Sequence, residues 1–330
     1  MTGNPTMNDV AREAGVALKT VSRFVNGETN INPVLAGRIA DAISTLGYRR
    51  NLAAASIRPG WTSKTIGLII SDLANPYYSA LTSAIESFAR ERGYLVISSS
   101  SDELGTQHDR LVDRLMEQRV DGLIVVPPRD PGRPWSAVTP PIPPLVFVDR
   151  PADFPQADVI LADNAGGARA ATAELLAHGR RRVAFVGDAL GISTMRERHA
   201  GYRAALEDVG IAADETIVRT DAHSSRQAAV AVAELLAKTD IDAVFAANNR
   251  ASVGALLAFR DAGRRLPLIG FDDFEAALVS SPGVSVVSHD IVEMGRRAAE
   301  LTLDRLAGSD REPATIVLPT RLVLRGSERI

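Results

Sequence analysis

The N-terminal part of the chain carries short amphipathic segments that predict three helices. Apolar residues at helical spacing favour a first helix over about 8–14, which Gly15 ends because glycine readily adopts a left-handed turn. A second helix is expected over about 18–25. A third begins where Asn32 provides a cap and Pro33 occupies the first helical position. This pattern is typical of a small all-helical domain.

From Thr65 onwards the pattern changes to short apolar runs that alternate with amphipathic segments. Such alternation predicts parallel sheets covered by helices, and about 265 residues are too many for one such sheet, so we expect two lobes. The expected strands are Ile66–Ile70, Leu95–Ser98, Leu123–Val126, Leu145–Val148, Val183–Val186, Ile217–Arg219, Ala243–Ala246, Leu268–Gly270 and Val284–Val287. The expected helices between them include Tyr78–Glu91, Gln107–Gln118, Ala165–Ala177, Glu197–Val209, Arg226–Ala237 and Ala251–Ala262.

Two segments stand apart from this alternation. Residues 51–58 have the composition of a short helix, which would be marginal in water by itself. Ten of the 18 prolines fall between Pro127 and Pro155. This proline-rich stretch is either an irregular surface loop around one strand or a loop that lines the mouth of a ligand site, and the pattern alone does not decide between them.

Composition excludes several classes of protein. Of the 330 residues, 45% are hydrophobic and 23% charged, as in ordinary globular proteins, and the absence of cysteine excludes disulfides, thiolate zinc sites and cysteine nucleophiles. No run of about 18 apolar residues predicts a membrane span, and the N-terminus does not resemble a signal peptide. We therefore expect a cytoplasmic protein. The scattered histidines show no metal-ligand spacing, and no cofactor is expected.

Charge is unevenly distributed along the chain. Residues 1–61 contain seven Lys or Arg and four Asp or Glu, whereas the whole chain carries a net charge of −3. A basic N-terminal part on an acidic remainder favours nucleic-acid binding by the N-terminal part. A difference of a few charges is common, so this signal needs a more specific one beside it.

The specific signal is the segment Met7–Asn26, which reads MNDVAREAGVALKTVSRFVN. It resembles the helix-turn-helix of the lactose-repressor (LacI/GalR) family, and the likeness continues in order through the chain. The further matching motifs are Gly47-Tyr48, Asn51, Ala54, Ile57, Ile66-Gly67-Leu68, Asn75-Pro76-Tyr77, Asp149-Arg150, Arg196-Glu197-Arg198, Gly201-Tyr202, Asn248, Gly270-Phe271-Asp272-Asp273 and Leu322–Gly326.

The resemblance implies that the second helix enters the DNA major groove, where its N-terminal side chains meet base edges. Leu18 and Lys19 would then select the operator sequence, and Arg23 would contact a guanine. The residues expected at DNA are Leu18, Lys19, Thr20, Ser22, Arg23 and Asn26, together with Asn51, Ala54 and Ile57 in the hinge. The alternative is that Lys19 and Arg23 are solvated surface bases.

Two positions depart from the family pattern. The family usually has Ser where this chain has Ala17, and losing that helix cap costs about 1 kcal/mol. It also favours Leu where this chain has Ile57, the residue that would wedge between base steps in the minor groove. The alternative role for Ile57 is a hydrophobic contact between two hinge helices.

Several polar residues follow predicted strands of the body, where parallel sheets bind ligands. Carboxylates and amides there can bond sugar hydroxyls, and an arginine adds a forked donor. The expected effector-binding residues are Ser71, Tyr77, Asp149, Arg198, Asn248, Asp272 and His289. By resemblance, several of these residues occupy positions that the family uses for effector binding. Asp221 and His223 also lie near the expected cleft.

Each of three effector candidates also has a purely structural alternative. Asp272 would stabilise its own loop beside Asp273, Asp149 would only pair with Arg150 or another nearby base, and Asn248 would cap the following helix.

Together these features predict an α/β protein with three parts. They are a small all-α helix-turn-helix head (1–50), a hinge helix and linker (51–62), and a two-lobed body with parallel sheets (63–330). By resemblance the body is periplasmic-binding-protein-like, and it provides effector binding and dimerisation. Lobe one would comprise about 63–162 plus 291–319, and lobe two about 163–290 plus 320–330.

The expected function is that of a transcriptional regulator, a repressor, whose affinity for operator DNA is controlled by a small molecule. One recognition helix reads a half-site, so a homodimer on a palindromic double-stranded operator is expected. The effector is expected to be a sugar or sugar derivative, with a purine as the alternative. The rival functions are a free-standing sugar-binding module and a sugar-phosphate or nucleotide enzyme, but no Gly-rich nucleotide loop or nucleophile motif is present.

Overall fold

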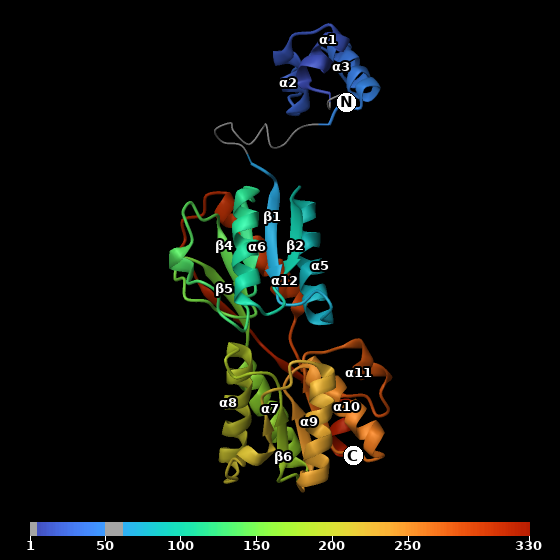
Figure 1. The fold of residues 1–330 in the computed structure, drawn as a ribbon, viewed down its shortest axis with the longest axis vertical. Coiled ribbons are helices and arrows are strands. Elements are labelled where there is room, and N and C mark those ends of the chain that lie inside the picture. Colours follow the sequence, from blue (N-terminus) through green and yellow to red (C-terminus); the bar gives the residue numbers. More distant parts are fainter. Residues whose placement is uncertain (1–4, 50–61) are drawn as a thin grey trace. The chain divides into compact units, whose positions relative to one another are not determined.

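The computed structural model describes residues 5–49 and 62–330, which belong to two compact units, Met1–Ser63 and Lys64–Ile330. We call the first unit the head and the second the body, and each is described by itself (Figure 1). The predicted combination of an all-helical head with a two-lobed α/β body is confirmed.

The head consists of three helices around a small core. They are α1 (Met7–Ala14), α2 (Leu18–Val25) and α3 (Pro33–Leu46). Thr6 and Asp9 form a capping box at the start of α1, and Gly15 follows it with a φ of 59°. Asn32 caps α3 by accepting a hydrogen bond from the backbone of Val34. The core contains the buried side chains of Val10, Ala11, Ala14, Val21, Ile39 and Ala42.

The first lobe of the body is a six-stranded parallel sheet with helices on both faces (Figure 1). The strand order is β11-β5-β4-β3-β1-β2. The strands are β1 (Thr65–Ile70), β2 (Leu95–Ser100), β3 (Gly122–Val125), β4 (Leu145–Val148), β5 (Asp158–Ala162) and β11 (Thr315–Leu318). The helices are α5 (Pro76–Glu91), α6 (Gly105–Glu117) and α12 (Ile291–Leu306). One apolar core lies beneath α5 and α12, and another lies on the α6 face.

The second lobe repeats this arrangement, with strand order β12-β10-β9-β8-β6-β7. Its strands are β6 (Val183–Val186), β7 (Val218–Arg219), β8 (Ala243–Ala246), β9 (Leu268–Phe271), β10 (Ser285–Ser288) and β12 (Arg321–Val323). Only the last pair, β10 with β12, is antiparallel among the strands described. The helices are α7 (Asn164–Ala177), α8 (Ser193–Asp208), α9 (Ser225–Lys238), α10 (Asn249–Ala262) and α11 (Glu275–Val279).

The chain passes between the lobes three times, after β5, after β10 and after β11. Each lobe therefore contains strands from distant parts of the sequence. Short one-turn helices occupy Trp135–Ala137, Glu215–Ile217 and Ser327–Arg329. Over the described ranges, the structure contains no helix with the length and apolar character that crossing a membrane requires.

The structure differs from the expected elements in several places. Helices α5 and α6 each begin two residues earlier, β2 ends two residues later, and α11 and α12 were not among the helices named. Helix α8 begins at Ser193, four residues before the expected Glu197, because Ile192 and Met195 are buried against the second lobe. The strands β5, β11 and β12 were not among those expected. β11 and β12 are short edge strands that are only half-buried, although three consecutive apolar residues lie in β11, Ile316–Leu318, and at the end of β12 and just after it, Leu322–Leu324.

Candidate functional site

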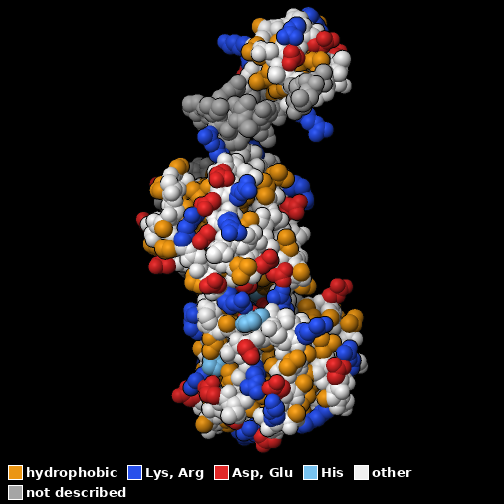
Figure 2. Space-filling model, in the orientation of Figure 1, with side chains coloured by type: hydrophobic (Ala, Val, Ile, Leu, Met, Phe, Trp, Pro, Cys, Tyr) orange, Lys and Arg blue, Asp and Glu red, His pale blue; other side chains and the backbone are white. Residues whose placement is uncertain are grey.

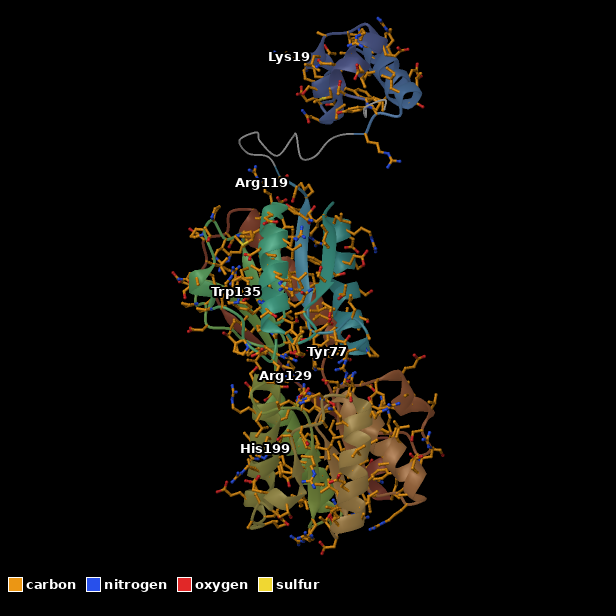
Figure 3. The ribbon with its side chains drawn as sticks, viewed as in Figure 1. Lys19, Tyr77, Arg119, Arg129, Trp135 and His199 are labelled. Atoms are coloured by element: carbon orange, nitrogen blue, oxygen red, sulfur yellow. The ribbon has the colours of Figure 1, made fainter. Side chains whose placement is uncertain are left out.

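Helix α2 presents its N-terminal side chains to solvent. Leu18 is 44% exposed and Lys19 is also exposed, whereas Val21 on the opposite side is fully buried in the head (Figure 3). Thr20 and Ser22 are half-buried. This outward side has the form of a recognition helix, because small polar side chains lie near the exposed, positively charged Lys19.

Arg23, the predicted guanine contact, is engaged within the head. Its Nε donates to Glu28 at 2.6 Å, and one Nη donates to the carbonyl of Asn30 at 2.9 Å. To reach a base edge, the guanidinium must leave these partners. Asn26 ends α2 and approaches the Ser22 hydroxyl at 3.5 Å.

Other predicted DNA-binding positions cannot be placed in the fold. Asn51, Ala54 and Ile57 lie outside the described residues. The position before α2 can be placed, and Ala17 there offers no side-chain cap to the helix.

The body contains a polar cleft between its lobes, and the fold brings six of the seven predicted effector residues to it. These six are Ser71, Tyr77, Asp149, Arg198, Asn248 and Asp272. The seventh, His289, lies behind Tyr77, whose hydroxyl is 3.3 Å from the His289 Nε2. His289 does not line this cleft, and it borders a separate hollow at the interlobe crossings instead.

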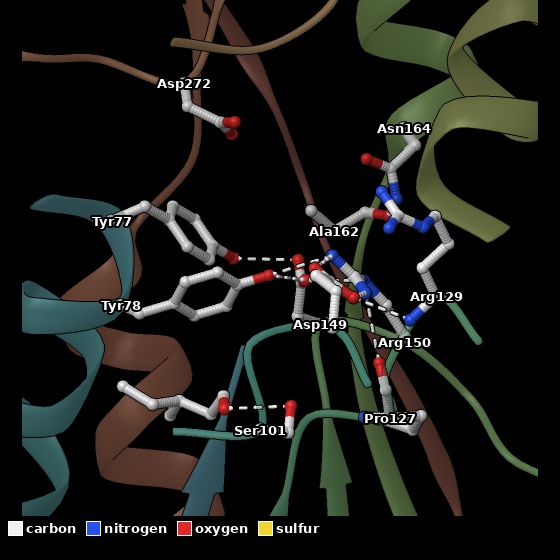
Figure 4. A network of polar contacts seen from close by, with 12 residues as sticks. Tyr77, Tyr78, Ser101, Pro127, Arg129, Asp149, Arg150, Ala162, Asn164 and Asp272 are labelled. Atoms are coloured by element: carbon white, nitrogen blue, oxygen red, sulfur yellow. Dashed lines mark hydrogen bonds and ion pairs between the residues drawn. The ribbon is translucent and has the colours of Figure 1, made fainter. Parts of the chain in front are cut away.

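The first lobe contributes a buried network of tyrosines and charges (Figure 4). The Tyr77 and Tyr78 hydroxyls donate to the two oxygens of Asp149, at 3.1 and 3.0 Å. Arg150 donates to both oxygens of Glu103 at 2.8 Å. Asp149 and Arg150 are 6% and 7% exposed, so the network lies almost entirely out of solvent.

The second lobe contributes Arg198, which is 3% exposed. Its Nε donates to the Asn164 side chain at 2.8 Å, and Nη1 donates to the carbonyl of Ala247 at 2.7 Å. The guanidinium also contacts both oxygens of Asp272, at 3.2 and 3.3 Å, and lies 3.6 Å from the centre of the Phe271 ring. These contacts hold Arg198 against Asp272 in the lining of the cleft.

Asp149 and Asp272 share an unusual backbone. They follow β4 and β9, which hold the same place in the two sheets, and have φ angles of 70° and 66°. Few residues with a side chain adopt this left-handed region, although aspartate tolerates it better than most. Each lobe thus positions one cleft carboxylate at the same strained turn.

Polar contacts also join the lobes directly. Asp72 pairs with Arg250, and Asn75 accepts a hydrogen bond from Asn249 at 2.8 Å. Arg129 of the first lobe lies 3.1 Å from His223 and 3.5 Å from Asp188 of the second. Figure 2 shows basic side chains and a histidine along the boundary between the lobes on the face in view.

The structure shows which contacts are made by Asn248, Asp149 and Asp272, the three residues for which a purely structural role was the alternative. Asn248 does cap α10, because its Oδ1 accepts from the backbone of Ala251 at 2.7 Å. Asp149 contacts Arg150 at 3.4 Å, but it also binds both tyrosines. Asp272 faces Arg198, while the neighbouring Asp273 pairs with Arg325 at 2.6 Å and so holds the loop. Asp272 therefore contacts Arg198 of α8, whereas the contact that joins this loop to the C-terminal segment is made by Asp273.

Further cleft residues were absent from the predicted set. They include Tyr78, Glu103, Asp188, Asn249 and Arg250. Asp188 follows β6, so the rule that polar residues after strands line the cleft would have found it. Nothing in the sequence indicates that Glu103, three residues after the half-buried edge strand β2, reaches Arg150.

Burial sets the protonation of the uncharged cleft groups. Burial, and then the negative charge of Asp149, raise the pKa of Tyr77 well above its usual value, so its hydroxyl keeps its proton. Burial lowers the pKa of His289. The Tyr77 hydroxyl therefore keeps the proton that it donates to Asp149 at neutral pH.

Two family models match the chain. Residues 6–51 match the bacterial regulatory proteins of the lacI family, and residues 172–328 match a periplasmic binding protein-like domain. The HTH-type transcriptional regulator CelR of Thermobifida fusca is 34% identical over 98% of both chains. The chain belongs to the lacI family of bacterial regulatory proteins.

Solved structures agree with this membership. A structure described as a transcriptional regulator CelR–cellobiose complex has a TM-score of 0.71 at 31% identity, and covers 98% of this chain and 99% of its own. The lac repressor dimer bound to operator and an anti-inducer has a TM-score of 0.85 at 24% identity, covering 99% and 100%, and supports the fold. As a lacI-family member, the chain is a DNA-binding transcriptional regulator, as predicted.

Proposed function

We propose that this lacI-family regulator is a repressor that binds an uncharged sugar in its interlobe cleft. The observation that carries the proposal is the convergence of Asp149, Arg198 and Asp272 on one polar cleft. Carboxylates accept hydrogen bonds from sugar hydroxyls and guanidinium donates to them, so the cleft suits a polyol. The similar CelR is described in complex with cellobiose.

Charge argues for a neutral sugar rather than a sugar acid or a sugar phosphate. Five carboxylates and three guanidinium groups line the cleft. An anionic ligand would add negative charge to a buried site that already has an excess of it, which is unfavourable at low dielectric. The same excess disfavours a nucleotide, although not an uncharged purine base.

Ligand entry must involve movement of the lobes. The cleft encloses about 50 Å³, which is room for a few water molecules but not for a sugar. Its charged groups bond to one another, both within each lobe and across the lobes. A sugar therefore has to separate the lobes and replace some of these contacts with its own hydroxyls.

The DNA side of the proposal rests on α2. A single short recognition helix reads only a half-site, so we infer a homodimer on a palindromic operator, acting in the cytoplasm where the chromosome lies. The rival function, a sugar-binding module without a regulatory role, leaves the head unexplained. The lacI-family match over residues 6–51 therefore favours the regulator.

Calorimetry on the full chain tests the sugar site. A panel of neutral mono- and disaccharides, with gluconate, glucose 6-phosphate and adenine for comparison, should yield binding only among the neutral sugars. Asp272→Asn should weaken binding at least tenfold, because Asp272 holds Arg198 and faces the ligand. Asp273→Asn is the matched control, since Asp273 pairs with Arg325 and does not line the cleft.

Two outcomes would contradict the proposal. Preferential binding of an acidic sugar or adenine would overturn the inference of a neutral sugar. Equal loss in both variants would show a general effect on the loop rather than a contact from Asp272. Operator affinity of the sugar-free protein should be unchanged in both variants.

A further inference from the structure

A groove of about 420 Å³ opens beside the cleft, between the proline-rich loop of the first lobe and the start of α8. Arg150 and Ile192 line both the groove and the cleft, so the two spaces adjoin. Figure 3 shows Trp135 within the first lobe and Arg129 close to the boundary between the lobes. The groove residues used below are His108, Arg133, Trp135, Gly191 and Arg196.

His108 brings an unmet hydrogen-bond acceptor to the groove. The side chain is 95% buried, and its Nδ1 lies 3.4 Å from the Asp109 carboxylate. An ionised carboxylate only accepts, so Nδ1 must carry the proton. Burial lowers the pKa of His108, which leaves Nε2 as a bare lone pair. Nε2 is buried and has no hydrogen-bond partner among the described residues.

Arg133 brings an unmet donor to the same groove. Both of its Nη atoms donate to Asp113, and its backbone N–H donates to Asp109 at 2.9 Å. Its Nε is buried, and the described part of the chain offers it no hydrogen-bond partner. Buried polar groups without partners are rare and call for an explanation. A hydroxyl group is both donor and acceptor, so a sugar hydroxyl that displaces the atoms covering these two groups would satisfy either of them.

The rest of the groove suits the apolar faces of a sugar ring. Trp135 is held by edge contacts to His108 and Phe147, with ring centres 5.8 and 5.4 Å apart. Five prolines of the loop region add rigid apolar surface: Pro127, Pro128, Pro131, Pro134 and Pro151. An apolar wall with a few placed polar groups, in a volume of several hundred Å³, is the usual form of a small-molecule site.

We propose that this groove is a second saccharide subsite, which takes a further sugar unit of an oligosaccharide whose first unit lies in the cleft. The proposal rests on the proposed function, because it extends the ligand of the cleft. Gly191 and Arg196 of the second lobe face the loop of the first lobe across the groove. A sugar unit here would contact both lobes.

Calorimetry with sugar series of increasing length tests the subsite in the full chain. The probes are glucose, cellobiose and cellotriose, and xylose, xylobiose and xylotriose. For the series that binds, the wild type should bind the disaccharide at least tenfold more tightly than the monosaccharide. Gly191→Phe should reduce this ratio to about one, because a side chain at Gly191 meets nothing within 4 Å and would fill the groove.

Two further variants separate a local effect from a general one. Ala200→Phe adds the same bulk at an exposed position of α8 outside the groove, and should keep the wild-type ratio. His108→Phe keeps an aromatic ring but removes the Nε2 acceptor, and should lower the ratio about three- to tenfold. Melting temperatures near that of the wild type would confirm that the variants fold.

The outcomes distinguish this proposal from the proposed function. Equal affinity for mono- and disaccharide, or a ratio unchanged in Gly191→Phe, would overturn the second subsite and leave the sugar site of the cleft intact. Binding of adenine or an anionic sugar, with no neutral sugar of any length binding, would overturn both.

Discussion

Single residues in and behind the cleft combine deep burial with hydrogen bonds to neighbouring side chains. His289 illustrates this, because burial lowers its pKa while Tyr77 contacts its Nε2. The nearby charges of Asp272 and Arg198 act on it in opposite directions. His108 is buried in the same way beside the groove. Both histidines are therefore neutral in the folded body at physiological pH.

This burial predicts a pH dependence of stability. Between the lowered pKa and the ordinary value of 6.5, the unfolded chain binds a proton that folded His289 does not, so stability is lost as pH falls below about 6.5. Each such histidine contributes at most about 1.4 kcal/mol per pH unit. Chemical denaturation at pH 7.5, 6.5 and 5.5 should show a smaller loss in His289→Gln. An identical loss in the variant would mean that His289 titrates as if exposed.

Lys19 carries a second prediction at this scale. It is exposed at the N-terminal end of α2, where side chains reach base edges. Lys19→Ala should change the selected sequence, with a loss of about 1–3 kcal/mol at one base pair. Selection from random DNA measures this. If wild type and variant select one palindrome with equal preference, Lys19 contacts only phosphate or solvent.

At the scale of elements, helix α2 is short and begins without a side-chain cap. Its eight residues follow Ala17, whereas α1 and α3 begin with the side chains of Thr6 and Asn32 accepting backbone hydrogen bonds. The backbone of Ala17 is extended, as an N-cap requires, and the side chain is exposed. A hydroxyl at this position would therefore meet no steric obstacle.

We predict that Ala17→Thr stabilises α2 by about 0.5–2 kcal/mol, because the hydroxyl would accept a backbone N–H of the first turn. Ala17→Val has nearly the same shape without the acceptor, and should give no such gain. Amide exchange of α2 in the full chain measures the effect. Equal protection in the Thr and Val variants would show that the cap contributes nothing here.

The sequence predicted the central elements well, because buried parallel strands are continuous apolar runs. Strands β4, β6 and β8 have the expected limits. Strand β5 was not predicted because it begins with an acidic residue, Asp158. This buried acid pairs with Arg305 and Arg311 from a distant segment. The sequence likewise does not show that the two lobes share one strand order. The two sheets have the same topology although their side chains differ.

The predicted cleft residues followed from one rule, that polar residues after parallel strands meet at a common edge. The rule placed Asp149 and Asp272 together but could not show their partners. Those partners, such as Glu103 for Arg150, depend on how loops from non-adjacent strands pack. The lack of a hydrogen-bond partner for Nε2 of His108 likewise results from how the side chains pack, and no pattern in the sequence predicts it.

For the whole body, the lobes are joined by chain crossings and by a few polar contacts. The pair Asp72–Arg250 lies at the ends of β1 and α10, and both side chains are partly exposed, at 27% and 32%. Partly exposed pairs contribute modestly, about 0.2–1 kcal/mol. A contribution of this size holds the lobes together while leaving them free to separate for a ligand.

We predict that Asp72→Asn and Arg250→Gln are energetically coupled by about 0.2–1 kcal/mol in the free energy of unfolding of the sugar-free body. The coupling should fall as salt increases, because the pair is partly screened. Asp261→Asn with Arg260→Gln is the control, since that exposed pair lies within α10. Strictly additive effects of the two cleft substitutions would show that the pair does not stabilise closure.

The left-handed backbones of Asp149 and Asp272 have a consequence for re-engineering this regulator toward other effectors. Glycine at either position would relieve the turn but delete the carboxylate, leaving buried Arg198 or the two tyrosine hydroxyls without their partner, so the turn and the buried network constrain these positions together. Asparagine tolerates the same turn and retains an acceptor. Libraries for altered ligand preference should therefore hold these two positions to Asp and Asn, and place their diversity on Thr194, Met195 and Ile192 around them.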